Sequence, residues 1–424
     1  MIRELQRRPF VRPLFLWITG ILLQLTFSYN YLSVLFLLYP CLLLVSAVFL
    51  NRKMGATCCY SARWIWGAAF ACLLLALSVQ VTEWKQNRPA KQTAILQLAG
   101  EKQTELVDAF DSLHLPDEEK SVLATITLGY RKGMNRETRK RFSIAGVAHI
   151  LAVSGFHVAI VCGFISFLLS FFPRYGIWKW LKYLSTLVLL WGFICITGLA
   201  ASAVRAGLML SLYLTGKALR RNADSYNTLA AAAFGMLVYN PLYLFDVGFQ
   251  LSYIAVFSIL YIQPMLRRCI VVKNPLLAVP WDLLTVTVAA QIGTSLLCCY
   301  YFGQVSSVFL FTNLPLVVIA MLLVSLSLLW LGMPHWLPGL DVLQQVVETL
   351  AGWMVKIVDL FSHVPGAAFT FRIDFLDMLI GYGILFSVMA SIRKYTPKYL
   401  LLLLFLLLIK LFAELIKRYY AFGI

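Results

Sequence analysis

Charged side chains are scarce in this chain of 424 residues, where Asp, Glu, Lys and Arg together make up 13% of the composition. A soluble domain carries roughly 25%. Hydrophobic residues account for 61%, and the mean hydropathy is +0.80. This scarcity excludes an ordinary soluble fold, because long apolar runs take the place of the missing charged residues. A helix needs about 20 apolar residues to cross a bilayer, and several of these runs approach that length. The composition therefore predicts an integral membrane protein.

Signatures of bound groups are also lacking. The cysteines include the adjacent pairs Cys58-Cys59 and Cys298-Cys299, whereas zinc sites use the spacing C-x2-4-C with a second half elsewhere. A P-loop is missing, because Gly216-Lys217 is followed by Ala218 and no glycine stands five residues before Gly216. We therefore predict no cofactor, no metal, no ATPase in the chain itself and no enzymatic activity.

Apolar runs make up much of the sequence. They lie at about Leu14–Phe27, Leu32–Leu50, Trp64–Val81, Val147–Phe172, Trp178–Thr197, Ala203–Leu219, Thr228–Tyr239, Val247–Ile262, Leu283–Phe302, Val308–Leu331, Met378–Ile392 and Tyr399–Ile416. Val342–Phe361 is more polar and is predicted either to lie at the membrane interface or to line a pore. We predict an all-α fold, a polytopic transmembrane bundle of roughly eleven to thirteen helices.

The net charge of +17 has two interpretations. Basic residues in Asn51–Arg63, Lys217–Arg221 and Arg267–Lys273 follow the positive-inside rule, which predicts a cytoplasmic N-terminus in the cytoplasmic membrane. The alternative is a path for a polyanion such as nucleic acid. This orientation places Thr82–Gly146 outside the cytoplasm. We expect three parts, namely N-terminal transmembrane helices at 1–81, an extracytoplasmic segment at 82–146 and a channel core at 147–424.

The polar stretch Thr82–Gly146 has the pattern of amphipathic helices. Apolar residues recur at helical spacing through Thr93–Leu113, and Pro116 precedes an acidic turn typical of a helix start. Met134–Phe142 is predicted to form a short basic amphipathic helix with Asn135 as its N-cap. Such helices beside a membrane normally lie on its surface, and a direct contact with substrate is the alternative.

Two histidines, His149 and His157, bracket Ser154-Gly155 in the apolar segment AGVAHILAVSGFHV. Ser-Gly is a place where a membrane helix can break. On one continuous helix, residues eight apart point about 80° apart, unlike the paired histidines of a zinc motif. A metal site, hydrogen-bonding histidines at a pore or helix contact, and simple packing all remain open, and the spacing disfavours the metal.

Charged and amide side chains also interrupt the apolar run between Thr197 and Tyr261. Arg205 lies one turn into an apolar helix, and Asp246 opens another. Both could reach the membrane interface, or they could be buried partners that offset each other's desolvation. Asn240 and Gln250 add hydrogen-bonding groups nearby in sequence.

Three segments, HILAVSGFHV, SAVRAGLML and NPLYLFDVGFQLSY, resemble in order and spacing the signatures of the ComEC competence family. GYRKGMNRETRKRFSIAGVAHI, before the first signature, is similar as well, and the resemblance extends over about Glu118 to Pro264. It implies a channel that carries single-stranded DNA across the cytoplasmic membrane during natural transformation. The positions that match the polar signatures, as pore-lining or pore-shaping residues, are His149, Ser154, Gly155, His157, Arg205, Asn240, Asp246, Gly248 and Gln250.

The resemblance also carries expectations about partners. The family's OB-like and metallo-β-lactamase-like domains have no counterpart in this sequence, so we expect a short form. A cytoplasmic helicase-like ATPase and a separate extracytoplasmic DNA receptor or nuclease would then complete the system, with single-stranded DNA and the lipid bilayer as the other partners. Two further hypotheses are a small-solute transporter on the same core and an intramembrane hydrolase that uses His149 or His157 with Ser154 or Asp246.

Overall fold

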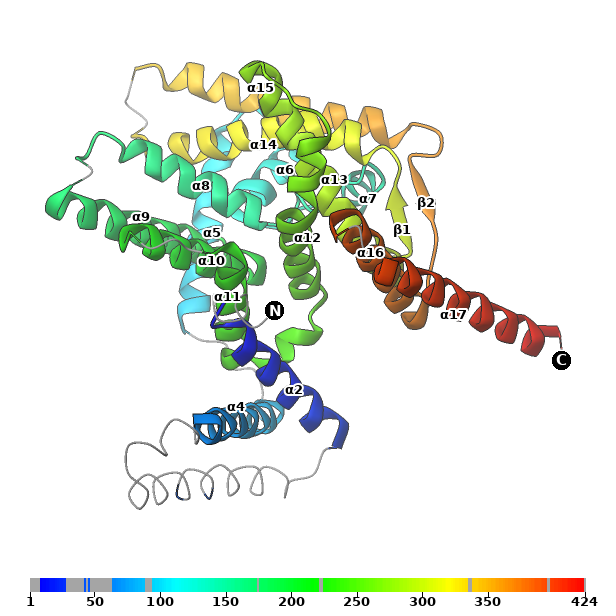
Figure 1. Ribbon diagram of the computed structural model, residues 1–424. Helices are drawn as coiled ribbons and strands as arrows, with labels where there is room; N and C mark the ends of the chain where they lie inside the picture. The colour runs from blue at the N-terminus through cyan, green and yellow to red at the C-terminus, as the bar shows by residue number, and fades with distance from the viewer. Residues whose placement is uncertain are drawn as a thin grey trace. The chain divides into compact units, whose positions relative to one another are not determined.

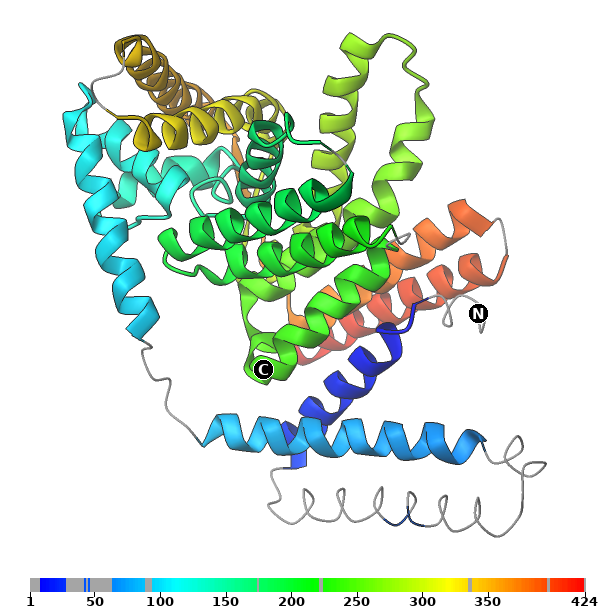
Figure 2. The same cartoon turned by 90° about the vertical axis from the view of Figure 1, so that its left-hand side faces the viewer.

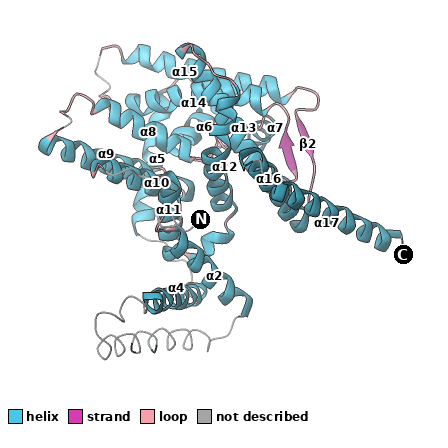
Figure 3. Ribbon diagram, in the orientation of Figure 1, coloured by secondary structure: helices cyan, strands magenta, loops and turns pink. Residues whose placement is uncertain are grey.

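Helices dominate the computed structural model, which describes residues 8–27, 42, 45, 63–87, 94–173, 175–220, 224–334, 338–394 and 397–422. Within these ranges the strands are a short antiparallel pair, β1 (Gln304–Ser306) and β2 (Ala368–Thr370), drawn in magenta in Figure 3. The register pairs Val305 with Phe369. The prediction of an all-α fold is therefore confirmed.

Six helices in the described ranges are long and apolar enough to cross a bilayer. They are Trp66–Gln86, Gly176–Ile196, Val247–Cys269, Pro275–Tyr301, Phe309–Gly332 and Phe375–Arg393. Two shorter apolar helices, Val11–Phe27 and Gly155–Leu168, accompany them. The chain is thus a polytopic membrane protein. The expected total of eleven to thirteen helices stays a prediction, and the run Leu32–Leu50 lies outside the described residues.

The chain divides into two compact units. The first combines Met1–Asp108 with Val153–Gln250. Its elements are α2 (Val11–Phe27), α4 (Arg63–Gln86), α5 (Ala94–Ala109), α8 (Gly155–Leu168), α9 (Gly176–Ile196), α10 (Ala201–Ala218), α11 (Ser225–Tyr239), η2 (Pro241–Phe245) and the first turn of α12 (Val247–Cys269). Within it α10 packs against α8, α9 and α11, and α2 packs against α4 and α11 (Figure 2).

Small residues allow close helix packing in this unit. Gly20 of α2 faces Ser78 of α4, where an added Cβ would lie 2.7 Å from the serine Cβ. The Ser78 hydroxyl donates a hydrogen bond of 2.6 Å to the carbonyl of Trp17. Without a hydrophobic driving force between helices in lipid, such close backbone contact and interhelical hydrogen bonding hold a bundle together.

The second unit combines Ala109–Ala152 with Leu251–Ile424. Its elements are η1 (Phe110–Ser112), α6 (Asp117–Leu128), α7 (Arg136–Ile144), the rest of α12, α13 (Pro275–Tyr301), β1, α14 (Phe309–Gly332), α15 (Leu340–Ser362), β2, α16 (Phe375–Lys394) and α17 (Pro397–Phe422), as labelled in Figure 1. The three-part division at residues 81 and 146 stays a prediction, and these compact units follow different boundaries.

Helix α6 of the second unit packs against α14 and α15. The acidic residues of its first turn complement the helix dipole, and Gly129, at φ +76°, ends it in the left-handed conformation. Every residue from Val122 to Leu128 is buried. This helix therefore differs from the surface-lying amphipathic helix that is normally expected beside a membrane.

The other expected helices of the polar stretch form nearly as predicted. The Thr93–Leu113 pattern corresponds to α5 and η1, and Met134–Phe142 corresponds to α7. Asn135 is the N-cap of α7, because its side chain accepts a hydrogen bond from the backbone N–H of Glu137. The more polar segment Val342–Phe361 forms α15, which packs against α14, α6 and α7.

Candidate functional site

The apolar run predicted at Val147–Phe172 is broken at Ser154-Gly155. Residues before Ser154 form turns, and α8 begins at Gly155 with Ser154 as its N-cap. The Nδ1 atom of His157 accepts the backbone N–H of Ser154 at 3.2 Å and lies 2.9 Å from the Ser154 hydroxyl oxygen. This capping arrangement satisfies groups that a helix break leaves open. The interpretation of Ser-Gly as a breaking point is confirmed.

The new helix start is fixed against α10. The hydroxyl of Ser202, in the first turn of α10, donates a hydrogen bond to the carbonyl of Val153. Gly155 faces Ala206, where an added Cβ would lie 3.4 Å from the alanine Cβ. His157, two residues further along α8, is fully buried.

Arg205 is buried in the first unit. Its side chain is 4% exposed, and its Nη2 donates a hydrogen bond of 2.8 Å to the carbonyl of Gly248. Its Nη1 lies 3.7 Å from Oδ1 of Asp246. Of the two interpretations from the sequence, buried pairing describes Arg205 and snorkelling to an interface does not. A carbonyl and a carboxylate together offset the desolvation of the guanidinium.

Asp246 belongs to both the ion pair and a helix cap. Its Oδ1 accepts the backbone N–H of Phe249 at 2.7 Å in the first turn of α12, and its side chain is 49% exposed. A Cβ on Gly248 would lie 3.1 Å from that oxygen and 3.4 Å from Nη2 of Arg205. Glycine at this position therefore leaves room for Arg205 to reach the helix start.

Asn240 and Gln250 hold the bend between α11 and α12. The Asn240 side-chain oxygen accepts the N–H of Leu242 at 3.2 Å, which ends α11 and starts η2. The Gln250 amide donates to the carbonyl of Leu244 at 2.9 Å. These amides bind the backbone of the bend, so in this unit their effect is to shape the chain around Asp246.

His149 is the predicted site residue that belongs to the second unit. It lies in the turns between α7 and α8. The other eight predicted residues belong to the first unit, where the structure brings Arg205, Asp246 and Gly248 into one cluster. Among the described residues, no group of three or more His, Cys, Asp and Glu side chains could hold a metal ion.

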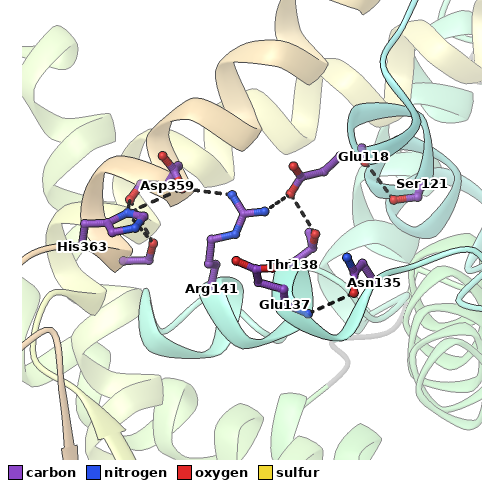
Figure 4. Close-up of polar contacts among 9 residues, drawn as sticks. Glu118, Ser121, Asn135, Glu137, Thr138, Arg141, Asp359 and His363 are labelled. Atoms are coloured by element: carbon purple, nitrogen blue, oxygen red, sulfur yellow. Dashed lines mark hydrogen bonds and ion pairs between the residues drawn. The ribbon is translucent and has the colours of Figure 1, made fainter.

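A second arginine cluster was not predicted from the sequence. Arg141 of α7 forms ion pairs with Glu118 of α6 and with Asp359 of α15, the latter at 2.9 Å, as Figure 4 shows. Thr138 donates to the same Glu118 carboxylate at 2.8 Å. The sequence carried one signal for this cluster. Arg141 lies three residues after Thr138 and next to Phe142, so on a helix it shares the face that the structure buries.

Near this cluster, burial beneath α15 perturbs one carboxyl group. Burial raises the pKa of Glu119, opposed by the nearby Lys356 ammonium and assisted by the neighbouring Glu118 carboxylate. Gly352 of α15 passes close by, because an added Cβ would lie 3.4 Å from Oε2 of Glu119. The first turn of α6 is therefore a crowded, acidic contact with α15.

Taken together, apolar spanning helices and a buried arginine cluster define a polytopic α-helical membrane protein with a polar interior site. The chain belongs to the competence protein family, whose sequence model matches residues 126–395, more than half of its length. This match confirms the resemblance that HILAVSGFHV, SAVRAGLML and NPLYLFDVGFQLSY indicate.

A curated relative is ComE operon protein 3 of Bacillus subtilis (strain 168), 29% identical over 230 residues. The match covers 52% of this chain and 28% of that protein. The chain therefore spans less than a third of the length of this relative. No solved structure matches the chain.

Proposed function

We propose that the chain forms a passage for single-stranded DNA across the cytoplasmic membrane during natural transformation. The observation that carries this proposal is Arg205, a guanidinium buried in α10 within the segment that matches the competence family. A buried cation in a membrane protein is costly and typically marks a substrate or ion pathway. A polyanion is the substrate that such a cation suits.

In this proposal the remaining signature residues shape the passage more than they contact DNA. Ser154 and His157 start α8, Asn240 and Gln250 hold the bend before α12, and Gly248 leaves room for Arg205. His149 is proposed to line or shape the passage in the second unit. No catalysis by the chain is required, because the work of transport comes from a partner.

The proposed orientation places the N-terminus in the cytoplasm and residues 82–146 outside it. A cytoplasmic helicase-like ATPase would pull the strand inward, and an extracytoplasmic receptor or nuclease would deliver it. The orientation is testable with cysteine-reactive reagents that do not cross membranes, applied to intact cells carrying Lys102→Cys in α5 and compared with cells carrying the wild-type chain, whose nine own cysteines give the background. Labelling from outside supports the orientation, and labelling only after lysis contradicts it.

The decisive experiment is single-channel recording of the purified protein in a planar bilayer, with single-stranded DNA added on the extracytoplasmic side. We expect transient, length-dependent blockades. Replacing Arg205 by Ala leaves the Asp246 carboxylate without its cation and reverses the local charge, so blockades should shorten by roughly tenfold, the size of a lost charge-assisted hydrogen bond.

Two variants serve as controls. Arg205→Lys keeps the positive charge and should retain most of the blockade time. Arg268→Ala removes an exposed cation in the last turn of α12 and should leave blockades unchanged. A wild-type conductance that is indifferent to DNA would contradict the proposal and favour a small-solute channel or transporter.

One observation favours a second candidate, an intramembrane hydrolase. The Ser154 hydroxyl lies 2.9 Å from Nδ1 of His157, within reach of a general base. Helix capping accounts for the same geometry, because that nitrogen also accepts the Ser154 backbone N–H. Ser154→Ala distinguishes the two, since a hydrolase would lose all turnover of a lipid or peptide ester, whereas a channel would keep its conductance.

A further inference from the structure

The turn before α7 and the outward side of α7 carry a concentration of positive charge. Five cations are exposed there, and we call them the basic α7 surface: Arg131, Lys132, Arg136, Arg139 and Lys140. Glu137 is the acidic residue in the same stretch. Within the part of the chain that the structure describes, none of the five forms an ion pair. Their charge is therefore available to an external partner.

Contacts on the inner face of α7 fix the orientation of the basic α7 surface. Arg141 holds α7 to α6 and α15 through Glu118 and Asp359, as Figure 4 shows. Thr138 and Phe142 are 2% and 1% exposed on the same inner face. Because the inner face is held by buried contacts, the cations on the opposite face keep a fixed outward position.

The same packing disfavours a membrane surface as the partner. A helix that lies in a lipid interface buries an apolar face in the acyl region while cations contact the headgroups. In α7 the aromatic side chain, Phe142, is buried inside the second unit. The exposed positions are Arg136, Glu137, Arg139 and Lys140. A surface of cations without an exposed apolar side chain suits a hydrated polyanion.

We propose that the basic α7 surface is a receiving site for the sugar-phosphate backbone of single-stranded DNA. This inference rests on the proposed function and adds a site that lies outside the nine signature residues of the passage. Arginine and lysine side chains that contact phosphates release bound counterions, so binding is strong at low salt and independent of base sequence. The electrostatic field of the surface also raises the local concentration of DNA.

The test uses the full-length protein in phosphatidylcholine nanodiscs and a fluorescent oligothymidylate, with binding followed by fluorescence anisotropy over a range of salt concentrations. The variant carries Arg136→Gln, Arg139→Gln and Lys140→Gln, which keep helix propensity and leave Asn135, Thr138 and Arg141 intact. Each lost phosphate contact lowers the salt slope by about 0.7, so the slope should fall by about 2. The affinity at low salt should fall at least tenfold.

A matched control carries Lys217→Gln, Arg268→Gln and Lys273→Gln, which remove the same charge from exposed positions at the ends of α10 and α12 and before α13. It should bind nearly as the wild type does. Equal losses in the two variants would reduce the effect to net charge and overturn the proposal. Replacing part of the phosphatidylcholine by phosphatidylglycerol gives another test, because a difference that disappears there would assign the cations to lipid headgroups.

The outcome is separable from that of the proposed function. If wild-type protein binds DNA and shows blockades but the α7 variant does so equally, the receiving site is wrong and the passage stands. If the wild type neither binds DNA nor shows blockades, the proposed function itself fails. In the expected case the α7 variant conducts small ions normally and shows blockades that are rarer but of unchanged duration, because capture is impaired and passage is not.

Discussion

Arg205 in the first unit and Arg141 in the second are both held by acidic groups, yet the two arrangements differ. Arg205 is 4% exposed, with one carboxylate at 3.7 Å, and that carboxylate, Asp246, is itself 49% exposed. Arg141 is 23% exposed and pairs with both Glu118 and Asp359. The more deeply buried arginine is therefore paired, over a longer distance, with the most exposed of the three carboxylates.

The arrangement around Arg141 is that of a structural contact between helices. The two carboxylates around Arg141 come from α6 and α15, so the guanidinium joins three helices of one unit. Arg205 instead donates to the neutral carbonyl of Gly248 and lies beside Asp246. A buried cation in a membrane protein is costly, and Arg205 is the one on which the proposed function rests.

The largest expected effect comes from Arg141→Met. It removes the cation shared by two partly buried carboxylates, which then repel each other across the contact between α6 and α15. Breaking a buried pair costs 3–5 kcal/mol, and the partial exposure of Arg141 reduces this to about 2–3 kcal/mol. Reversible unfolding in mixed micelles measures the change in the free energy of unfolding.

Arg139→Met is the matched control for this prediction, because Arg139 lies on the same helix but is exposed. It should change the free energy of unfolding by no more than about 0.5 kcal/mol. Similar losses in both variants would show that Arg141 is an ordinary surface charge. Arg141 would then no longer be a structural ion pair to compare with Arg205.

The next effect in size comes from Asp246→Asn. An asparagine side-chain oxygen can still accept the N–H of Phe249, so the helix cap remains, but Arg205 loses its acidic partner. Loss of this ion pair should cost about 1–3 kcal/mol of unfolding free energy, measured in the same micelles. An unchanged free energy of unfolding would show that the ion pair with Asp246 does not contribute to stability.

Asp359→Asn makes the same chemical change in the other cluster. Arg141 keeps Glu118, so the expected loss is below about 1 kcal/mol. The order of the two asparagine variants thus checks the comparison directly. A larger loss at Asp359 than at Asp246 would reverse it.

Much of the helical architecture could be predicted from hydrophobic runs and local capping. The expected run Ala203–Leu219 corresponds to α10, Ala201–Ala218, and Asn135 caps α7 as predicted. These features depend on residues within one or two helical turns of each other, so a sequence displays them directly.

The buried position of α6 could not be predicted in this way. Thr125 and Thr127 make the helix look half polar, yet both are fully buried. Each hydroxyl bonds to a carbonyl one turn earlier, at Ser121 and Leu123, with hydrogen bonds of 2.7 Å and 2.6 Å. A threonine that satisfies its own hydroxyl can enter a core, and hydropathy does not register this.

The candidate site was predicted in part for a similar reason. The cost of a buried charge indicated that Arg205 and Asp246 could pair, since each helps the other's desolvation. The carbonyl of Gly248 has no side-chain signature, and Asp359 lies far from Arg141 in the sequence. Contacts to backbone and between distant segments require the tertiary structure.

The smallest expected effect comes from Glu119→Gln in α6. This variant tests whether burial of the first turn of α6 destabilises the ionised carboxylate. Burial raises the pKa of Glu119 in the fold, although Lys356 opposes the shift. The ionised form therefore destabilises the fold at neutral pH, and this penalty fades as the pH falls through the raised pKa towards the ordinary value of 4.5.

Glu119→Gln should accordingly stabilise the protein by no more than about 0.5 kcal/mol at neutral pH, and the gain should vanish on acidification. Glu101→Gln, at an exposed position of α5, is the control and should give no pH-dependent difference. Unfolding curves of the three proteins across the acidic range decide the matter. A neutral-pH loss in Glu119→Gln would mean that the Lys356 attraction outweighs burial, so that this acidic turn holds α15 by charge as Glu118 and Asp359 hold Arg141.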